Sequence, residues 1–342
     1  MNIENIFTQA VGHDVESLRN YLLGNPGKPF LAVGSGGMYG VAEFVTLMYC
    51  SRSGLARTLT PLEFNSVSDE VLGESKILLF SAGGHNNDIK FAAKRALSLN
   101  PEGSACLCLH GGEKNKLIPL FAKAGASQRV FCFDSNVHDG FVSCDTPLMC
   151  YAILTKVFSN SSNFASLAES HDRYFSVVTA SGEDLGTESL AGVEHFTILN
   201  AGWGAPVAEL LEGKFVESGW ASGQVTDYRN YCHGRFIFTS NHLANSAVVM
   251  LISPREKALS ARILAFLPKD TKVVLIETGK DGPEAGLDLA VKMTGFFEKA
   301  AESVGVNPDS PKNPGRIDKR APIWVPFAAD LKKAGPLKTG SR

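Results

Sequence analysis

The chain lacks three features that would assign it to common classes of protein. No run rich in lysine and arginine precedes its mildly basic tail, and 33 basic and 35 acidic residues leave a formal net charge of -2. This balance argues against a nucleic-acid-binding protein, which carries a basic stripe. No apolar stretch reaches the about 18 residues of a transmembrane helix, and Met1–Asn5 does not begin a signal peptide. We therefore expect a cytoplasmic protein that binds neither nucleic acid nor a membrane.

The seven cysteines follow no disulfide or metal-binding pattern. Their number is odd, and several stand inside apolar runs such as residues 105–109. This placement is typical of small buried hydrophobic side chains in a reducing compartment. Cys106 and Cys108 point to one face of an expected strand, but no partner pair has the spacing of a zinc site. We expect neither a metal site nor a bound cofactor.

The length of 342 residues predicts about two domains of ordinary size. Short, continuous apolar runs alternate with segments of helical pattern, which indicates parallel sheets covered by helices on both faces. The predicted strands lie at residues 29–33, 76–81, 105–109, 129–133, 196–200, 247–252 and 272–277. The predicted helices lie at about residues 3–24, 37–52, 88–99, 115–124, 206–219, 254–267 and 284–304.

A strand, a glycine-containing turn and a helix open both halves of the chain. The turn is Gly34–Gly37 in the first half and Ala201–Gly204 in the second, where Pro206 is well placed to begin a helix. We predict an α/β fold of two similar three-layer αβα domains with mainly parallel sheets, an N-terminal helix and an extended C-terminal arm. The predicted domains cover residues 28–150 and 185–305, and the arm covers residues 306–342.

Two glycine-containing turns, Gly34–Gly37 and Ser81–Asp88, end strands of the first domain. Ligands of open α/β sheets bind at the carboxyl ends of strands, and backbone N–H groups at a helix start form an anion site. The alternative is a tight turn that needs glycine for its backbone angles. Tyr39 stands where a dinucleotide-binding fingerprint would have its third glycine, so NAD binding is the weaker interpretation.

Lys214, Glu217 and His233 form a second group of candidate site residues. Lys214 and Glu217, three positions apart, lie on one face of a helix, and His233-Gly234 follows sixteen residues beyond the glutamate. Such a set can move protons on a sugar carbon skeleton, because histidine titrates near physiological pH. The alternative is a solvated ion pair, which contributes a few tenths of a kcal/mol, beside a histidine without chemical function.

These motifs, in this order, resemble the tandem form of the sugar isomerase (SIS) family, which includes the isomerase half of glutamine–fructose-6-phosphate transaminase (glucosamine-6-phosphate synthase). The resemblance covers nearly the whole chain. The family's Lys-Leu-Lys-Glu helix appears as Lys214-Phe215-Val216-Glu217, and its ring-opening histidine as His233-Gly234. The resemblance implies that Glu217 is the base, and that His233 reaches the site of the neighbouring subunit in a homodimer.

The resemblance also marks residues that would hold the substrate. The family's Ser-Gln-Ser-Gly-Glu-Thr loop corresponds to Ser81–Asn86, with Gly83 in place of its second serine and Asn86 in place of its threonine. Arg316 stands where the C-terminal tail of the family has a lysine, and its permanent charge would hold an anion but could not form a Schiff base. The implied substrate-binding residues are Ser35, Gly36, Ser81, Gly83, Gly84, Asn86 and Arg316.

The resemblance implies an enzyme that acts on a phosphorylated or amino sugar through an enediol or enediolamine. Glu217 would move a proton between C1 and C2, and Lys214 would hold an oxyanion or a neighbouring hydroxyl. Isomerisation, deamination and deglycation of a sugar–amine adduct use the same proton transfer, and all three stay open. The chain begins Met1-Asn2, so we expect neither the synthase's N-terminal cysteine nor its glutaminase domain. A non-catalytic sensor of sugar phosphates is the alternative.

Overall fold

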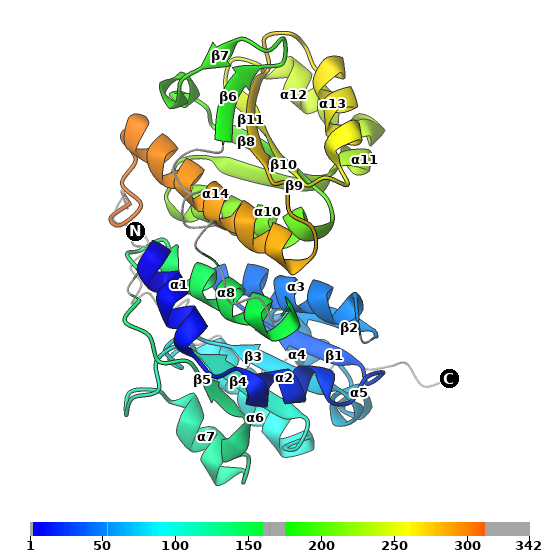
Figure 1. Ribbon diagram of the computed structural model, residues 1–342, viewed down its shortest axis with the longest axis vertical. Helices are drawn as coiled ribbons and strands as arrows, with labels where there is room; N and C mark the ends of the chain where they lie inside the picture. Colours follow the sequence, from blue (N-terminus) through cyan, green and yellow to red (C-terminus); the bar gives the residue numbers. More distant parts are fainter. Residues whose placement is uncertain (1–2, 53, 138, 160–163, 165–174, 312–342) are drawn as a thin grey trace. The chain divides into compact units, whose positions relative to one another are not determined.

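The computed structural model describes residues 3–52, 54–137, 139–159, 164 and 175–311. These residues divide into two units, each with one β-sheet (Figure 1). The N-terminal unit spans His13–Asn136. The C-terminal unit comprises residues 3–12 and 137–311.

Five strands form the sheet of the N-terminal unit: β1 (Phe30–Val33), β2 (Ala56–Leu59), β3 (Lys76–Phe80), β4 (Ser104–Cys108) and β5 (Val130–Cys132). They pair in parallel, in the order β2-β1-β3-β4-β5. Every residue of β1, β3 and β4 is buried, which explains why these strands are continuous apolar runs and why they were predictable. The predicted set omits β2, because this short edge strand is partly exposed and carries a polar sequence.

Helices cover both faces of this sheet and complete the predicted three layers. On one face, Leu31, Leu79 and Cys106 belong to a core with apolar residues of α4, α6 and α7. On the other face, Phe30 stacks on Tyr49 of α3, with ring centroids 4.8 Å apart. The helices of the unit are α2 (Glu16–Leu23), α3 (Gly37–Cys50), α4 (Pro61–Ser66), α5 (Asp69–Glu74), α6 (Asn87–Leu99) and α7 (Leu117–Lys123).

The opening helix predicted over residues 3–24 is two helices. The first, α1 (Ile3–Gly12), belongs to the C-terminal unit, whereas α2 belongs to the N-terminal unit. The Asp14 side chain accepts a hydrogen bond of 2.9 Å from the N–H of Glu16, the first residue of α2. A carboxylate that accepts a hydrogen bond from an N–H group in the first turn favours the start of a new helix at this point. The prediction of a single helix was therefore wrong.

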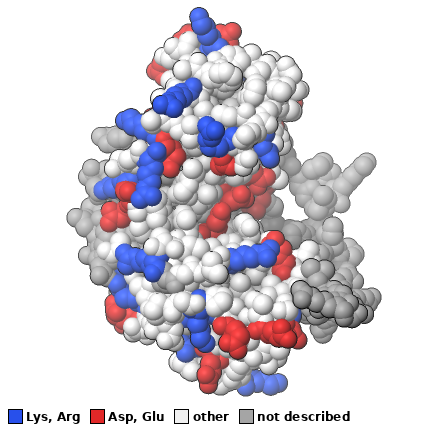
Figure 2. Space-filling view, turned by 90° about the vertical axis from the view of Figure 1, so that its right-hand side faces the viewer, with Lys and Arg blue, Asp and Glu red and all other residues white. Residues whose placement is uncertain are grey.

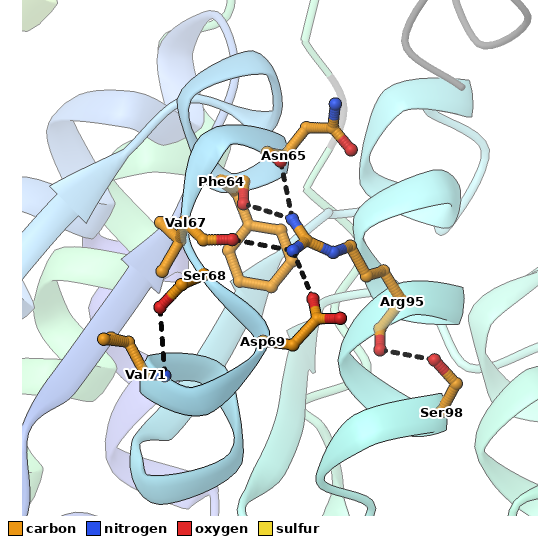
Figure 3. Close-up of polar contacts among 8 residues, drawn as sticks. All are labelled: Phe64, Asn65, Val67, Ser68, Asp69, Val71, Arg95 and Ser98. Carbon is orange, nitrogen blue, oxygen red and sulfur yellow. Dashed lines mark hydrogen bonds and ion pairs between the residues drawn. The ribbon is translucent and has the colours of Figure 1, made fainter. Parts of the chain in front are cut away.

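Arg95 of α6 holds the connection between β2 and β3 in place (Figure 3). Its guanidinium donates hydrogen bonds of 2.6–2.9 Å to the backbone carbonyls of Phe64, Asn65 and Val67, and it forms an ion pair with Asp69. The planar guanidinium with several fixed donors suits such a cluster of acceptors. Arg95 therefore ties α4 and α5 to the helix that follows the Ser81–Asn86 turn.

The C-terminal unit has a six-stranded sheet with strands β6 (Phe175–Thr179), β7 (Asp184–Leu185), β8 (His195–Asn200), β9 (Ser222–Asp227), β10 (Ser246–Ile252) and β11 (Lys272–Glu277). Their order is β7-β6-β11-β10-β8-β9. Strands β9, β8, β10 and β11 run parallel, whereas β6 and β7 add antiparallel pairs at one edge. The sheet is therefore mainly parallel, as predicted.

Apolar side chains pack helices on both faces of this second sheet. Phe196 of β8 stacks on Phe215 of α10 at 4.1 Å, and Phe215 also contacts Phe296 and Phe297 of α14. The opposite face packs against α11 and α13. The helices are α1, α8 (Asp145–Ser159), α10 (Ala205–Glu217), α11 (Tyr228–Asn230), α12 (Phe236–Asn241), α13 (Lys257–Phe266) and α14 (Pro283–Ser303).

The described helices and the visible surface carry no sign of a membrane-spanning segment or a basic stripe. Within the described ranges, no helix combines the length and the apolar character needed to cross a bilayer. On the face shown in Figure 2, lysine and arginine side chains are interspersed with aspartate and glutamate.

The two sheets share one strand order. It is β2-β1-β3-β4 in the N-terminal unit and β9-β8-β10-β11 in the C-terminal unit, with every pair parallel. In each sheet the first strand of this set lies between the second and the third. The chain therefore continues to the second strand on one side of the first strand and to the third strand on its other side. Ligands of open α/β sheets bind at such a switch point, outside the carboxyl ends of the first and third strands.

Candidate functional site

Both glycine-containing turns of the N-terminal unit lie at its switch point. β1 pairs directly with β3, with Val33 opposite Leu79, and the turns Gly34–Gly37 and Ser81–Asn86 leave the carboxyl ends of these two strands. The structure therefore places six of the predicted substrate-binding residues at one edge of one sheet. They are Ser35, Gly36, Ser81, Gly83, Gly84 and Asn86.

The first turn depends on glycine at two positions. Gly36 has a φ of +56°, a left-handed backbone that disfavours any residue with a Cβ atom, and it immediately precedes α3. A Cβ on Gly34 would lie 2.3 Å from the carbonyl oxygen of Met38. The half-buried Ser35 stands between them at the start of the helix. The backbone carbonyl of Ser35 accepts a hydrogen bond from the Met38 N–H in the first turn of α3, so the residue lies at the N-terminal end of this helix.

The second turn is shaped by a side chain from outside it. Gly84 has a φ of +68°, and a Cβ there would lie 2.0 Å from Oδ1 of Asn115. Asn115 is buried; its Nδ2 donates to the His110 carbonyl at 2.7 Å, and its Oδ1 accepts from the Leu117 N–H at 2.9 Å. Asn115 therefore cannot move aside cheaply. Gly84 was predicted from the sequence as a site residue, whereas no sequence pattern indicated that Asn115 lies against it.

The two ends of the Asn86 side-chain amide have different roles. Its Oδ1 accepts hydrogen bonds from the N–H groups of Asp88 and Ile89, at 2.9 and 3.0 Å, and so caps α6. Only the NH₂ group of the amide is left to donate to a ligand. Asp88 follows in the first turn of α6, and burial raises the pKa of its carboxyl group.

The second turn also offers backbone donors. Within the described part of the chain, the N–H groups of Gly83, Gly84 and His85 donate to no backbone carbonyl. They precede the N-terminal end of α6, where the helix dipole favours an anion. The Ser81 hydroxyl lies at the start of the same turn. The edge therefore combines hydroxyl, amide and backbone donors, a set suited to an anionic oxygen ligand.

The structure places Lys214 inside the C-terminal unit and Glu217 on its surface. Lys214 is 3% exposed; its Nζ donates to the Ser143 carbonyl at 2.5 Å and lies 3.3 Å from Sγ of Cys144. Glu217 is exposed at the last residue of α10. The two side chains share a helix, but the ammonium of Lys214 is engaged by the segment that precedes α8.

His233 lies in an irregular turn after β9. Residues Tyr231–Arg235 form a kinked turn, whose backbone is not helical at His233 or at Gly234, where φ is +108°. His233 is exposed. Gly234 is required by this backbone geometry, which gives a structural reason for the His-Gly pair in the sequence.

Glu217 and His233 lie at opposite ends of the parallel strands of the C-terminal sheet: Glu217 lies at their amino ends and His233 at their carboxyl ends. In the unit β8-α10-β9 both strands run parallel, so α10 starts at their carboxyl ends and returns to the other edge. The N–H of Ser222, just beyond α10, accordingly bonds the Glu194 carbonyl, just before β8. With its 13 residues, α10 is about 20 Å long. One C-terminal unit therefore does not bring the two residues together.

A cavity of about 620 Å³ lies within the C-terminal unit and was not predicted. Cys144 and several carboxylates line it, among them Asp139, Asp145 and Glu298. Burial, together with the charges of Asp139 and Glu298, raises the pKa of Asp145 to about 6, while Lys214 lowers it. Asp139 accepts hydrogen bonds from the N–H groups of Cys144 and Asp145 and so caps the start of α8.

Among the described residues, no group of three histidine, cysteine, aspartate or glutamate side chains is arranged to hold a metal ion. Arg316 and the remainder of the predicted arm from residue 312 lie outside the described residues.

Comparisons with solved structures show what the fold resembles. The chain is similar over 91% of its length, and 95% of the other chain, to the C-terminal domain of glucosamine–fructose-6-phosphate aminotransferase from Francisella tularensis, at 12% identity and a TM-score of 0.66. It is similar over 92% of its length, and 95% of the other chain, to tagatose-6-phosphate ketose/aldose isomerase from Escherichia coli, at 16% identity and a TM-score of 0.67.

A third likeness is to glucosamine-6-phosphate deaminase from Thermotoga maritima, over 93% of this chain and 98% of that one, at 18% identity and a TM-score of 0.60. Models of protein families and the curated proteins contain no match. These likenesses establish the α/β fold with its mainly parallel sheets.

Proposed function

We propose that the chain is a sugar isomerase-type enzyme of the SIS family, which acts on a phosphorylated or amino sugar by proton transfer through an enediol or enediolamine. The observation that carries the proposal is the meeting of both glycine turns at the switch point of the N-terminal unit. Proteins named as a sugar-phosphate isomerase, an aminotransferase domain and a deaminase share the fold, which supports the same class of substrate.

The N-terminal unit would hold the anionic group of the sugar. The proposed donors are Ser81, the NH₂ group of Asn86 and the N–H groups of the second turn that donate to no backbone carbonyl in the described part of the chain. Ser35 and Gly36 follow β1, the strand that pairs with β3. Because backbone donors and the α6 dipole replace the two missing hydroxyl groups of the family loop, a phosphate remains the expected ligand group.

The C-terminal unit would supply the proton carriers. Glu217, exposed at the end of α10, is the proposed base, and His233 the group that assists ring opening. Because the two lie at opposite ends of the strands of one sheet, we propose a homodimer in which His233 serves the site of the neighbouring copy. For Lys214 we propose a positioning role, since its bonds to Ser143 and Cys144 fix the last turn of α10.

Ligand binding followed by isotope exchange tests the proposal. Thermal-shift measurements with hexose, hexosamine and sugar–amine phosphates should reveal a stabilising ligand. That ligand, incubated with the protein in D₂O, should incorporate deuterium at C1 or C2. Binding without exchange would contradict an enzyme and favour the sugar-phosphate sensor. Stabilisation by the unphosphorylated sugars alone would contradict the anion-binding role of the N-terminal unit.

A further inference from the structure

Cys144 and Lys214 bring a thiol and a primary amine together inside the C-terminal unit. Sγ of Cys144 and Nζ of Lys214 are 3.3 Å apart. The two residues are 70 positions apart in the sequence, and each is held by its own element. Cys144 stands at the capped start of α8, and Lys214 stands in the last turn of α10. The contact is therefore part of the packing between these two segments.

Among the described residues, this amine is the hydrogen-bond partner of the thiol. Nζ of Lys214 donates to Sγ of Cys144, and the charges of Glu298 and Asp139 also act on the thiol. The arrangement differs at Cys108 and Cys132, which pair across β4 and β5 and whose thiols interact with each other. An oxidised sulfur at Cys144 thus has a nitrogen rather than a thiol as its neighbour.

The cavity gives a small oxidant access to the sulfur. Cys144 is 9% exposed and forms part of the wall of the cavity of about 620 Å³. Hydrogen peroxide is small enough to enter such a space. Lys214 is 3% exposed and is not among the residues that line the cavity, so we expect the oxidant to reach the thiol first.

We propose that Cys144 and Lys214 form a covalent sulfur–nitrogen bond when hydrogen peroxide oxidises the protein. In the first step the thiol takes up one oxygen and loses two electrons to become a sulfenic acid, and the peroxide is reduced to water. In the second step the ammonium of Lys214 releases a proton to solvent, and its nitrogen attacks the sulfur. The S–OH bond breaks, the S–N bond forms, and the hydroxyl leaves as water after taking up a second proton from the nitrogen. The sum is one thiol, one ammonium and one peroxide converted to one sulfenamide, two waters and one proton.

The bond would change the end of the helix that carries Glu217. It removes the positive charge of Lys214 and replaces the hydrogen bond to Ser143 with a covalent link between α10 and the segment before α8. Because a thiol reductant cleaves a sulfenamide, the change is reversible. The pair is thus a modification site for an oxidant, independent of which sugar the protein binds.

The reaction should accelerate as the pH rises. Burial raises the pKa of Cys144, and the ammonium of Lys214 offsets part of this increase while Glu298 and Asp139 add to it. The thiolate is the form that peroxide oxidises. The thiolate of Cys144 is more abundant above neutral pH, so the yield of the bond should be higher at pH 9 than at pH 7.

Mass spectrometry of the full chain tests the proposal. The protein is treated with hydrogen peroxide and digested, without reductant, by a protease that does not cleave after lysine. The expected product joins the peptides of Cys144 and Lys214, with two hydrogen atoms fewer than their sum, and disappears after a thiol reductant. A product that retains an extra oxygen would overturn the sulfur–nitrogen step.

Three variants serve as controls. Cys144→Ser should abolish the product, and Lys214→Arg should abolish it while Cys144 remains open to sulfenic-acid trapping with dimedone. Lys292→Arg should leave it unchanged, because buried Lys292 contacts the Glu277 carbonyl and Asp288 but no sulfur in the contacts described. Oxidation of wild-type Cys144 to sulfenic or sulfinic acid with Lys214 left free would overturn the proposal, whatever the variants do. So would an unmodified Cys144 under conditions that oxidise Cys108 and Cys132.

Discussion

Asn115 occupies the space that any side chain at residue 84 would need. Its Oδ1 would lie 2.0 Å from a Cβ on Gly84, whereas a Cβ on Gly83 would meet only the tip of the His85 ring, at 3.2 Å. Two adjacent glycines of one turn thus differ in how strongly they are required. The difference gives the N-terminal unit a matched pair of variants.

Gly84→Ala should disrupt the second turn, and Gly83→Ala should leave it nearly intact. The left-handed backbone alone costs alanine about 1–2 kcal/mol at residue 84, and the contact with Asn115 adds to it. Urea denaturation should show the loss in the free energy of unfolding, and phosphate-ligand binding should weaken with it. Equal effects of the two substitutions would contradict the role given to Asn115.

Glu217→Gln should abolish isotope exchange while ligand binding stays. A carboxylate that acts as a base contributes roughly 100- to 10,000-fold to the rate, and glutamine keeps its shape without its basicity. Glu212→Gln, on the same helix, is the control and should exchange at close to the wild-type rate. The rate of deuterium incorporation, with binding measured in parallel, separates the two. A Glu217→Gln protein that exchanges normally would remove this residue from the mechanism.

A mixture of two inactive variants tests whether His233 crosses to the neighbouring copy. Glu217→Gln and His233→Ala should each be inactive alone as homodimers. After mixing and subunit exchange, one site of each mixed dimer has an intact Glu217 and an intact His233 from different chains, so part of the activity should return. The recovered exchange rate, with the oligomeric state from light scattering, is the measurement. No recovery in a proven mixed dimer would contradict the shared site.

Arg95→Met should destabilise the N-terminal unit more than Arg255→Met destabilises the C-terminal unit. Arg95 is largely buried and serves three carbonyls and Asp69, so its loss leaves acceptors without donors and should cost about 2–3 kcal/mol. The ion pair of Arg255 with Asp281 is exposed and should contribute at most about 1 kcal/mol. Denaturation curves for the two variants give the comparison, and similar losses would contradict the argument.

Asp145→Asn should stabilise the protein relative to the wild type, and this gain should be larger at pH 7 than at pH 4. Burial and the neighbouring Asp139 raise the pKa of Asp145 from 3.8 to about 6, so the folded state favours the protonated form. The contribution of Asp145 to the stability of the wild type therefore falls as the pH rises from about 4 to about 6, because the unfolded chain loses this proton at a lower pH than the folded protein. Asparagine avoids this loss. The difference in unfolding free energy between variant and wild type should grow over that interval; a constant difference would contradict the raised pKa.

The sheets could be predicted from the sequence because their central strands are buried on both faces. Every residue of strands 76–80 and 246–252 is buried, so each strand is a nearly continuous apolar run. Such a run can be recognised in the sequence without knowledge of the neighbouring strands. The edge strand β9 (Ser222–Asp227) is mostly polar and partly exposed, and it left no such pattern. The glycine turns were equally visible, since a left-handed backbone admits little else.

The buried central strands and the chemical types at the candidate sites could be determined from the sequence alone: glycine turns, Lys214 with Glu217 on one helix, and His233 before a glycine. Only the tertiary structure decided what each of these faces. It put Asn115 against Gly84, turned Lys214 inward to Ser143 and Cys144, and set Glu217 and His233 at opposite ends of the strands of one sheet. Spacing along a chain reports neighbours within one helix or strand, whereas these contacts join segments that only the packing of the helices and sheets brings together.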